Sequence, residues 1–381
     1  MKKILFIHGS ADLYGASQIL ISTLKGLDKK LAKPVVLLPY EEKLDLKIRS
    51  LGIPVEIGPI AVLRRQNFNF IGFLLFVNDL FRSLFFIRKL DNAYNFDAIF
   101  TSTSAVISGA LYAKLFGKKH IWHILEITSK PKFFKYIMPH FINMFSNLCI
   151  CLSGAVKQYI SSGKTEGFKS KIIYCGTALS NNTNCVNASV SQNRITFGMI
   201  GRLNRLKGQE VFIKAAALTM KERQDLHFLL VGSPFKNEEK FLDRVKILVS
   251  ELHLEKDIDI LGFTENIACI YKQIDIVVVP STEPEAFGLV AVEAMAMKKA
   301  VIASDIGGLP EVVIDKETGI LFEAGNAEQL KDAMLKLADD AALRKKMGET
   351  GFRRQQLYFT EEKYTEEIGR TIMSFLEIKS K

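Results

Sequence analysis

Short apolar runs alternate with longer stretches of helical periodicity along most of the chain. In the first half the apolar runs predict strands at Ile4–Ile7, Val35–Leu38, Ala98–Thr101, His120–His123 and Leu148–Ser153. In the second half they predict strands at 195–200, 227–231, 258–261, 276–279 and 300–303, with helices at 209–220, 241–251 and 327–338 between them. Strands that alternate with helices in this way are typical of parallel sheets covered by helices. The pattern therefore predicts an α/β fold with one doubly wound domain in each half.

A polar segment separates the two halves. Leu179–Asn193 is rich in Ser, Asn and Thr and nearly free of apolar residues, which is typical of an interdomain linker. We expect a first domain at 1–185, completed by a C-terminal helix at about 361–381, and a second domain at 190–360. Two glycosylation sequons, at Asn181 and Asn187, lie in the linker. Because no export signal accompanies them, we interpret them as chance matches.

Residues 60–90 combine phenylalanines with basic side chains, among them Arg64, Arg65, Arg82, Arg88 and Lys89. Asn78, Asp79 and Arg82 interrupt the apolar run, so we expect no transmembrane span here. As a helix, the stretch would carry a narrow polar stripe on a wide apolar surface. Such a helix either lies in a membrane interface or packs in the core of the first domain, and the sequence leaves both open.

Composition adds a charge argument. The 381 residues are 48% hydrophobic and 24% charged, as in ordinary globular proteins, with a formal net charge of +10. A basic chain favours nucleic acid, an anionic membrane surface or a phosphorylated small molecule as partner. We find no nucleic-acid-binding module and expect no nucleic-acid partner. The five cysteines include no C-x-x-C pair, so we expect neither a disulfide framework nor a zinc site, and a cytoplasmic location.

The most informative segment, residues 280–296, follows the predicted strand at 276–279 and turns from a loop into a helix. Gly288 would let a ligand approach the backbone, and the free N–H groups of Phe287, Gly288 and Leu289 would bind an anion. Glu285 precedes this turn and Glu293 lies within the helix. Eight positions at a rise of 1.5 Å place the two carboxylates up to about 12 Å apart. Two hydroxyl acceptors beside a diphosphate site suit a nucleotide-sugar, whereas an isolated pair would indicate a solvated helix face.

A basic loop supports this interpretation. Gly201–Gly208 follows the predicted strand at 195–200 and carries Arg202 and Lys207. A departing nucleoside diphosphate develops negative charge, which these two cations could neutralise without a metal. Carboxyl ends of parallel strands meet at one edge of a sheet, where open α/β folds bind ligands.

Three motifs together resemble glycosyltransferase family four: the loop at 201–208, the pair Glu285-x7-Glu293, and Ser304–Glu311 with its two glycines. The resemblance is strong over the second half and weak over the first, where residues 14–17 and 122–126 and Ser153 carry it. It implies a GT-B fold with two Rossmann-like domains facing a central cleft. It also implies a retaining transferase that uses a UDP- or GDP-sugar.

The resemblance implies a role for each site residue. Glu285 would contact donor-sugar hydroxyls, Glu293 the ribose, and Arg202 and Lys207 the diphosphate. His123 would contact the sugar from across the cleft, and Gly15 would lie near the donor phosphates or the acceptor. Three residues depart from the family pattern: Lys298 stands in place of glycine, Ala300 in place of proline, and Cys175 in place of asparagine.

Other motifs fail on inspection. The sequence at 161–165 ends like a P-loop, but the first glycine of that motif would fall at Gln158. Gly9 begins a loop that lacks the second glycine of the dinucleotide fingerprint. Asp257 and Asp259 resemble a metal-binding acidic pair, although acids at a strand start are common. We therefore expect no metal and no cofactor.

Two alternatives stay open beside the transferase: a sugar-nucleotide epimerase with the same fold, and a non-catalytic subunit of a membrane complex. For the transferase we expect a lipid-linked saccharide acceptor of bacterial surface polysaccharide. Basic and aromatic side chains at 60–90 and at 130–136 would hold the enzyme on the inner face of the cell membrane, in contact with anionic lipid.

Overall fold

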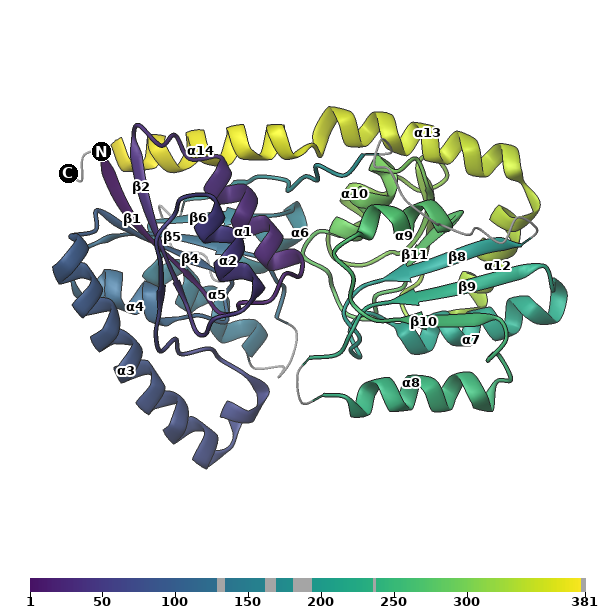
Figure 1. The fold of residues 1–381 in the computed structure, drawn as a ribbon, viewed down its shortest axis with the longest axis horizontal. Helices are drawn as coiled ribbons and strands as arrows, with labels where there is room; N and C mark the ends of the chain where they lie inside the picture. Colours follow the sequence, from purple (N-terminus) through teal and green to yellow (C-terminus); the bar gives the residue numbers. More distant parts are fainter. Residues whose placement is uncertain (129–133, 162–168, 181–193, 236–237, 378–381) are drawn as a thin grey trace. The chain divides into compact units, whose positions relative to one another are not determined.

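The computed structural model describes residues 1–128, 134–161, 169–180, 194–235 and 238–377. These residues form two compact units (Figure 1). The first unit comprises Met1–Cys175 together with Glu361–Lys381, and the second comprises Gly176–Thr360. The expected linker at 179–193, most of the P-loop-like sequence at 161–165, and Lys130, Lys132 and Phe133 lie largely or wholly outside the described residues.

The first unit is built on a seven-stranded parallel sheet with the order β3-β2-β1-β4-β5-β6-β7. Apolar side chains of the central strands are fully buried, as expected for a parallel sheet covered on both faces. The strands are β1 (Lys2–His8), β2 (Ala32–Leu38), β3 (Val55–Ile57), β4 (Ala98–Ser102), β5 (Lys119–Ile124), β6 (Leu148–Cys151) and β7 (Ser170–Ile172). The helices are α1 (Gly15–Lys25), α2 (Lys43–Ser50), η1 (Arg65–Phe68), α3 (Phe70–Tyr94), α4 (Ser108–Leu115), α5 (Phe134–Phe145), α6 (Gly154–Ser161) and α14 (Glu361–Glu377).

The second unit has a six-stranded parallel sheet with the order β10-β9-β8-β11-β12-β13. Its core joins the apolar faces of the central strands to α7, α8 and α12. The strands are β8 (Ile195–Ile200), β9 (Leu226–Val231), β10 (Ile258–Leu261), β11 (Ile276–Val279), β12 (Ala300–Ser304) and β13 (Gly319–Phe322). The helices are α7 (Gln209–Glu222), α8 (Lys240–Glu251), α9 (Ile267–Gln273), α10 (Leu289–Ala296), α11 (Leu309–Val312), α12 (Ala327–Asp339) and α13 (Ala341–Tyr358).

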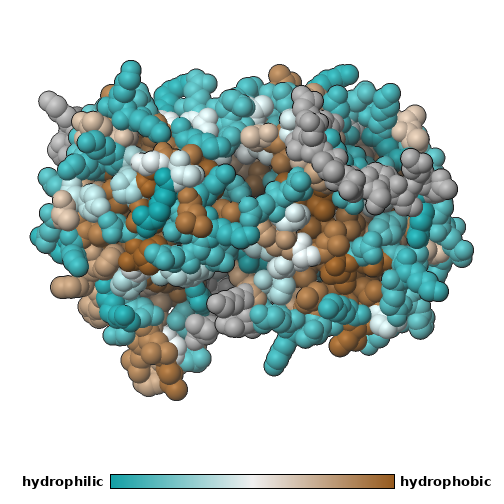
Figure 2. Space-filling view, viewed as in Figure 1, coloured by the Kyte–Doolittle hydropathy of each residue, from teal (hydrophilic) through white to brown (hydrophobic). Residues whose placement is uncertain are grey.

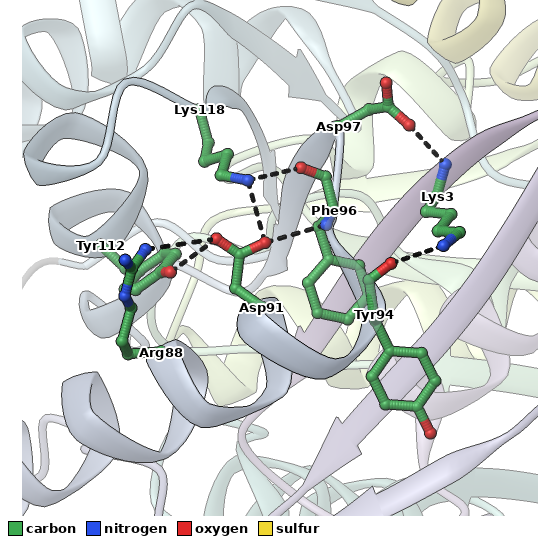
Figure 3. A network of polar contacts seen from close by, with 8 residues as sticks. All are labelled: Lys3, Arg88, Asp91, Tyr94, Phe96, Asp97, Tyr112 and Lys118. Atoms are coloured by element: carbon green, nitrogen blue, oxygen red, sulfur yellow. Dashed lines mark hydrogen bonds and ion pairs between the residues drawn. The ribbon is translucent and has the colours of Figure 1, made fainter.

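The long helix α3 is held at its C-terminal end and exposed at the other. The buried Asp91 carboxylate accepts hydrogen bonds from the Tyr112 hydroxyl at 2.7 Å, Lys118 Nζ at 2.9 Å and the Phe96 backbone N–H at 2.9 Å (Figure 3). Burial opposes ionisation of Asp91, but these donors outweigh it and hold its pKa below the usual range. This network fixes the C-terminal end of α3 beside α4 and β5.

The N-terminal half of α3 projects from the first unit (Figure 1). Phe70 is 78% and Ile71 70% exposed, and hydrophobic surface gathers at this free end (Figure 2). By length and composition alone α3 could cross a membrane: its most apolar window of 18 residues has a mean hydropathy of 1.8, and 22% of that window is buried. The exclusion of a span by Asn78, Asp79 and Arg82 was therefore too strict. A mostly buried core helix, the other interpretation of this stretch, does not describe α3 either.

Most predicted elements are present, and the exceptions have physical reasons. All ten predicted strands exist, but three further strands, β3, β7 and β13, were not predicted. β3 and β7 have three residues each and lie at sheet edges, where one short strand needs no continuous apolar run. The first unit ends at Cys175 rather than near residue 185. This follows because Gly176 and Thr177 pack on the end of the second unit: Thr177 N–H donates to the Phe359 carbonyl at 3.1 Å.

The cysteines differ from expectation at one position. Cys149, Cys151 and Cys175 are free and buried. Cys269 on α9 is disulfide-bonded, which the cysteine pattern did not predict.

Candidate functional site

The candidate site of the second unit lies where the strand order reverses. β8 pairs with β9 on one side and with β11 on the other. The chain runs from β8 to β9 in one direction across the sheet and from β11 to β12 in the opposite direction, so the strand order reverses between β8 and β11. Open α/β sheets bind ligands at the carboxyl ends of the strands at such a switch point. The loop at 201–208 follows β8, and the loop at 280–288 follows β11, so both predicted loops meet here.

Hydrogen bonds tie these two loops together. The Thr282 N–H donates to the Leu206 carbonyl at 2.9 Å, and its hydroxyl donates to the Arg205 carbonyl at 2.9 Å. Gly208 takes a φ of 83°, and a Cβ there would lie 1.8 Å from the Pro280 carbonyl oxygen. Only glycine fits both this conformation and this contact. The basic loop and the Glu285 loop are therefore one rigid structure.

Lys207 and Glu285 form an ion pair at the centre of this structure. Lys207 Nζ lies 2.6 Å from Glu285 Oε1, and the Ser281 hydroxyl donates to the same oxygen. The side chains are 33% and 14% exposed. Burial favours the neutral acid, but Lys207 and Ser281 outweigh burial and hold the pKa of the Glu285 carboxyl below its usual range. Glu285 is therefore a fixed anion in this structure, and Lys207 retains donors for a second partner.

The turn after β12, which contains Gly307 and Gly308, packs against the backbone of the Glu285 loop. The Gly308 N–H donates to the Glu285 carbonyl at 2.8 Å. Gly307 has a φ of 63°, and a Cβ on it would lie 2.3 Å from that carbonyl oxygen. The turn thus fixes the backbone of Glu285, which gives the motif at 304–311 a structural role in the site.

Gly288 directly precedes α10, as predicted, and the structure gives an additional reason for a glycine at this position. Its φ is 111°, and a Cβ would lie 2.5 Å from Leu309 Cδ2, so backbone conformation and packing both require glycine. Leu289 is the first residue of the helix, whose opening N–H groups have no partner within the helix. The Phe287 side chain is buried, with its ring 5.5 Å from that of Phe359. Phe287 can therefore offer only its backbone to a ligand.

Arg202 lies in the same loop as Lys207, with its guanidinium carbon 3.9 Å from the centre of the Phe235 ring. Phe235 follows β9, the other neighbour of β8, and is 43% exposed. This stacking holds the guanidinium at the sheet edge. The sequence did not single out Phe235, because an aromatic residue after a strand carries no signal by itself.

Glu293 differs from Glu285 in its surroundings. Its Oε2 accepts a hydrogen bond from the hydroxyl of the buried Tyr271 at 2.8 Å. Burial raises the pKa of Glu293 to about 7, and the Tyr271 hydrogen bond opposes that rise only in part. Sequence analysis missed Tyr271 and Ser281, the partners of the two carboxylates. Tyr271 and Ser281 are both buried, so the pattern of apolar and polar positions gave no sign that they contact the carboxylates.

In the first unit, the structure places His123 and Gly15 at the same edge of the sheet. Gly15 is exposed at the first residue of α1, directly after the loop that follows β1. His123 near the end of β5 is 0% exposed, and burial lowers its pKa to about 3. Ser153 follows β6 and is also buried. The predicted sugar contact of His123 stays a prediction, and the ring has no exposed surface in this structure.

The departures from the family pattern are accommodated locally. Lys298 takes a φ of 57°, the conformation that explains a glycine at this position, and its ammonium lies 4.8 Å from the Phe352 ring centre. Ala300 is the first residue of β12, where proline is also tolerated. Among the described residues, no group of three His, Cys, Asp or Glu side chains could hold a metal ion. Asp257 is paired instead with Arg194, and Asp259 with His227.

The two sheets, each with its switch point, define the chain as a GT-B protein, and solved structures of that fold agree. HepE from Anabaena, in complex with UDP-glucose, superposes with a TM-score of 0.83 over 98% of this chain and 100% of its own, at 24% identity. A sucrose-phosphate synthase from Thermosynechococcus elongatus superposes with a TM-score of 0.80 at 19% identity, with full coverage of both chains.

Sequence comparison finds glycosyltransferases among the relatives of this chain. Residues 186–354, most of the second unit, match the model of glycosyl transferases group 1. An uncharacterized glycosyltransferase of Methanocaldococcus jannaschii is 33% identical over 261 residues, 64% of this chain and 66% of that protein. The lipopolysaccharide core biosynthesis mannosyltransferase LpcC of Rhizobium leguminosarum bv. viciae is 31% identical over 179 residues, 47% of this chain and 51% of that protein. The chain thus spans between half and two thirds of the length of these two relatives, and its homologues are glycosyltransferases.

Proposed function

We propose that the protein is a retaining glycosyltransferase of the family-four type that moves a sugar from a UDP- or GDP-sugar to a saccharide acceptor. The observation that carries the proposal is the Lys207–Glu285 ion pair at the switch point of the second sheet. Arg202 lies on the same loop as Lys207, and α10 begins four residues after Glu285. An ionised acceptor, two cations and a helix N-terminus at one place match the hydroxyls and the diphosphate of a nucleotide-sugar.

Each group has a task in this reaction. Arg202, Lys207 and the first N–H groups of α10 stabilise the negative charge that develops on the departing diphosphate. Glu285 accepts hydrogen bonds from donor-sugar hydroxyls and so orients the anomeric carbon. In a retaining reaction without an enzymic nucleophile, the acceptor hydroxyl attacks from the face that the diphosphate leaves. Its proton passes to the leaving phosphate oxygen, so the reaction needs no separate base. We propose that the cations replace a metal in this role.

Nucleotide release tests this proposal. The purified protein is incubated with a panel of UDP- and GDP-sugars, with and without acceptor lipid extract, and the free nucleoside diphosphate is measured. We expect release with one donor, and an NMR spectrum of the product that shows the donor's anomeric configuration. Conversion of the donor sugar without nucleotide release would instead identify an epimerase. Donor binding with neither product would identify a non-catalytic subunit.

Relatives support a lipid-linked acceptor. One relative is named for lipopolysaccharide core synthesis, and the structural neighbours include a lipopolysaccharide outer core galactosyltransferase, WaaB, with a TM-score of 0.69. A lipid-linked acceptor requires the enzyme to reach a membrane surface. We therefore propose that the enzyme is cytoplasmic and docks on the inner face of the cell membrane.

The exposed half of α3 is the docking element in this proposal. Many of its apolar side chains are exposed, and Arg82 and Lys89 follow on exposed positions of the same helix. Aromatic side chains can enter the lipid interface while cations meet anionic headgroups, each basic residue contributing on the order of 1 kcal/mol near the surface. On α5, Tyr136 and Ile137 are also exposed.

Co-sedimentation with vesicles tests docking. Vesicles of 70% phosphatidylcholine and 30% phosphatidylglycerol should pellet the wild type, and salt should weaken binding. The double variant Phe70→Ser and Phe73→Ser should lose most binding, whereas Leu46→Ser, at a 67% exposed leucine on α2, should not. Equal sedimentation of all three proteins would contradict docking through α3.

A further inference from the structure

Three buried polar residues lie side by side at the carboxyl edge of the first sheet. His8 on β1 pairs in register with Ser102 on β4, which pairs with His123 on β5. Residues in register on adjacent strands face the same side of the sheet. Among the described residues, His8 Nδ1, Ser102 Oγ and both ring nitrogens of His123 have no hydrogen-bond partner. Buried polar atoms are normally satisfied, so this edge is built to meet a polar ligand or bound water.

A strained loop lies next to these residues. Thr103, which follows β4, takes a φ of 81°, a conformation that β-branched residues rarely adopt and that clusters at functional sites. Its N–H donates to the His123 carbonyl at 3.0 Å, and its carbonyl accepts from the Trp122 indole N–H at 2.9 Å. The loop Thr103–Val106 is therefore attached directly to the end of β5.

Glu126 holds this loop in place. Its Oε1 accepts hydrogen bonds from the Ser104 N–H at 2.7 Å, the Ser104 hydroxyl at 2.7 Å and the Ala105 N–H at 3.1 Å. The Thr103 hydroxyl also donates to it. Four donors from three successive residues converge on one oxygen, which offsets the strain at Thr103. Glu126 itself belongs to the segment that the family resemblance covers only weakly, and no role is attached to it there.

The same loop is bonded to the chain that enters α3. The Leu63 N–H donates to the Ala105 carbonyl at 2.8 Å, and Val62 forms an antiparallel bridge with Val106. Farther along, the Arg64 N–H donates to Asn67 Oδ1 at 2.6 Å, and Asn67 Nδ2 donates to the Gly72 carbonyl at 3.2 Å.

The first turn of α3 continues this connection. The Gly72 N–H donates to the Asn69 side chain at 2.7 Å. Local hydrogen bonds and the short segment 62–67 thus connect the exposed turn of α3 to the loop that Glu126 holds. The other end of α3 is fixed by the hydrogen bonds to Asp91, so a restraint on the free end can act on this segment.

We propose that Glu126 is a positioning residue, and that the loop Thr103–Val106 is the element through which docking of α3 on an anionic lipid surface acts on the His8–Ser102–His123 edge. The inference rests on the docking proposed above. Docking restrains the first turn of α3 and favours the held loop, because the lipid surface binds the restrained segment better than the released one. Docking then increases the fraction of molecules in which the loop is held and the edge is preorganised.

Hydrogen exchange with the vesicles described above tests the proposal. In the wild type, vesicles should slow exchange of the Leu63, Ser104 and Ala105 amides by at least about 3-fold. Trp122 is the only tryptophan and is bonded to Thr103, so its fluorescence reports on the same loop. Bound vesicles with unchanged exchange at these amides would overturn this inference and leave docking intact. Absence of vesicle binding would overturn both.

Variants separate positioning from structural support. Glu126→Ala should bind vesicles normally but exchange these amides at least about 10-fold faster, with the vesicle effect lost. Glu126→Gln keeps the accepting oxygen, so its amide exchange should be slowed by vesicles as in the wild type. Glu56→Ala removes a carboxylate that accepts from Tyr94 at 2.6 Å, away from the loop, and should change neither. Should Glu126→Ala fail to fold, Thr103→Gly relieves the strained φ and removes one donor. It should fold and show a smaller vesicle effect, and an undiminished effect would overturn the proposal.

Discussion

The affinity for the nucleotide-sugar should depend on pH through Glu293. Burial raises its pKa to about 7, so near neutrality the free protein holds this side chain half protonated. A ribose offers hydroxyl donors, which a carboxylate accepts better than a carboxylic acid does. If only the carboxylate form binds, the apparent Kd rises by the factor 1 + 10^(pKa − pH). With a pKa of about 7 this factor is about 11 at pH 6 and about 1.1 at pH 8, a difference of about 10-fold or 1.4 kcal/mol.

Isothermal titration calorimetry with the intact nucleotide-sugar at pH 6, 7 and 8 measures this dependence. The diphosphate diester does not titrate in this window, and the pKa of Glu285 lies below its usual range, so neither contributes. Glu293→Gln should bind more weakly at pH 8 and show no pH dependence. Tyr271→Phe removes the hydrogen bond that favours the ionised form, so its midpoint should move to higher pH. A wild-type Kd that is constant from pH 6 to 8 would refute the reasoning.

Four further results are expected. Glu285→Gln should lower turnover by at least about 100-fold with little change in nucleotide affinity, and near-normal turnover would remove Glu285 from its role. Arg202→Ala and Lys207→Ala should weaken binding of the free nucleoside diphosphate as well as turnover, whereas Arg205→Ala, at an exposed position of the same loop, should do neither. Activity should persist in excess chelator, and loss that Mg²⁺ or Mn²⁺ restores would contradict the cationic site. Because the pKa of Glu293 is raised in the folded state, the contribution of this residue to ligand-free stability should be fully present below about pH 4.5 and be lost as pH rises through about 7, a loss that the difference in thermal melts between the wild type and Glu293→Gln should show.

Strands of the sheet centres could be predicted because they are buried on both faces and read as continuous apolar runs. β8, β10 and β11 begin and end at the predicted residues. The edge strands β3 and β7 could not be predicted, since three half-buried residues carry no pattern. Likewise, α3 is apolar around most of its surface, and composition alone could not distinguish a buried helix from the largely exposed one in the structure.

Site residues on the two central loops could be placed from the sequence because both loops follow strands that are neighbours in the sheet. The sequence could not show that Ser281 and Tyr271 would partner the two carboxylates, since those contacts depend on packing between elements. Nor could it show why Gly307 and Gly308 are needed. The structure supplies the reason, because a side chain on either would collide with the backbone of the Glu285 loop.

The environments of the two carboxylates separate their chemistry. From the sequence alone, Glu285 and Glu293 are equivalent acceptors eight positions apart. In the structure a lysine keeps Glu285 ionised, while Glu293 has only a neutral hydroxyl and a raised pKa. Groups whose pKa values are pushed apart in one site usually have different roles. Glu285 can then hold the sugar with the same charge at every physiological pH, whereas Glu293 must lose a proton as the nucleotide binds. Donor binding should therefore release a fraction of a proton near neutrality, and that proton comes from the residue farther from the reacting bond.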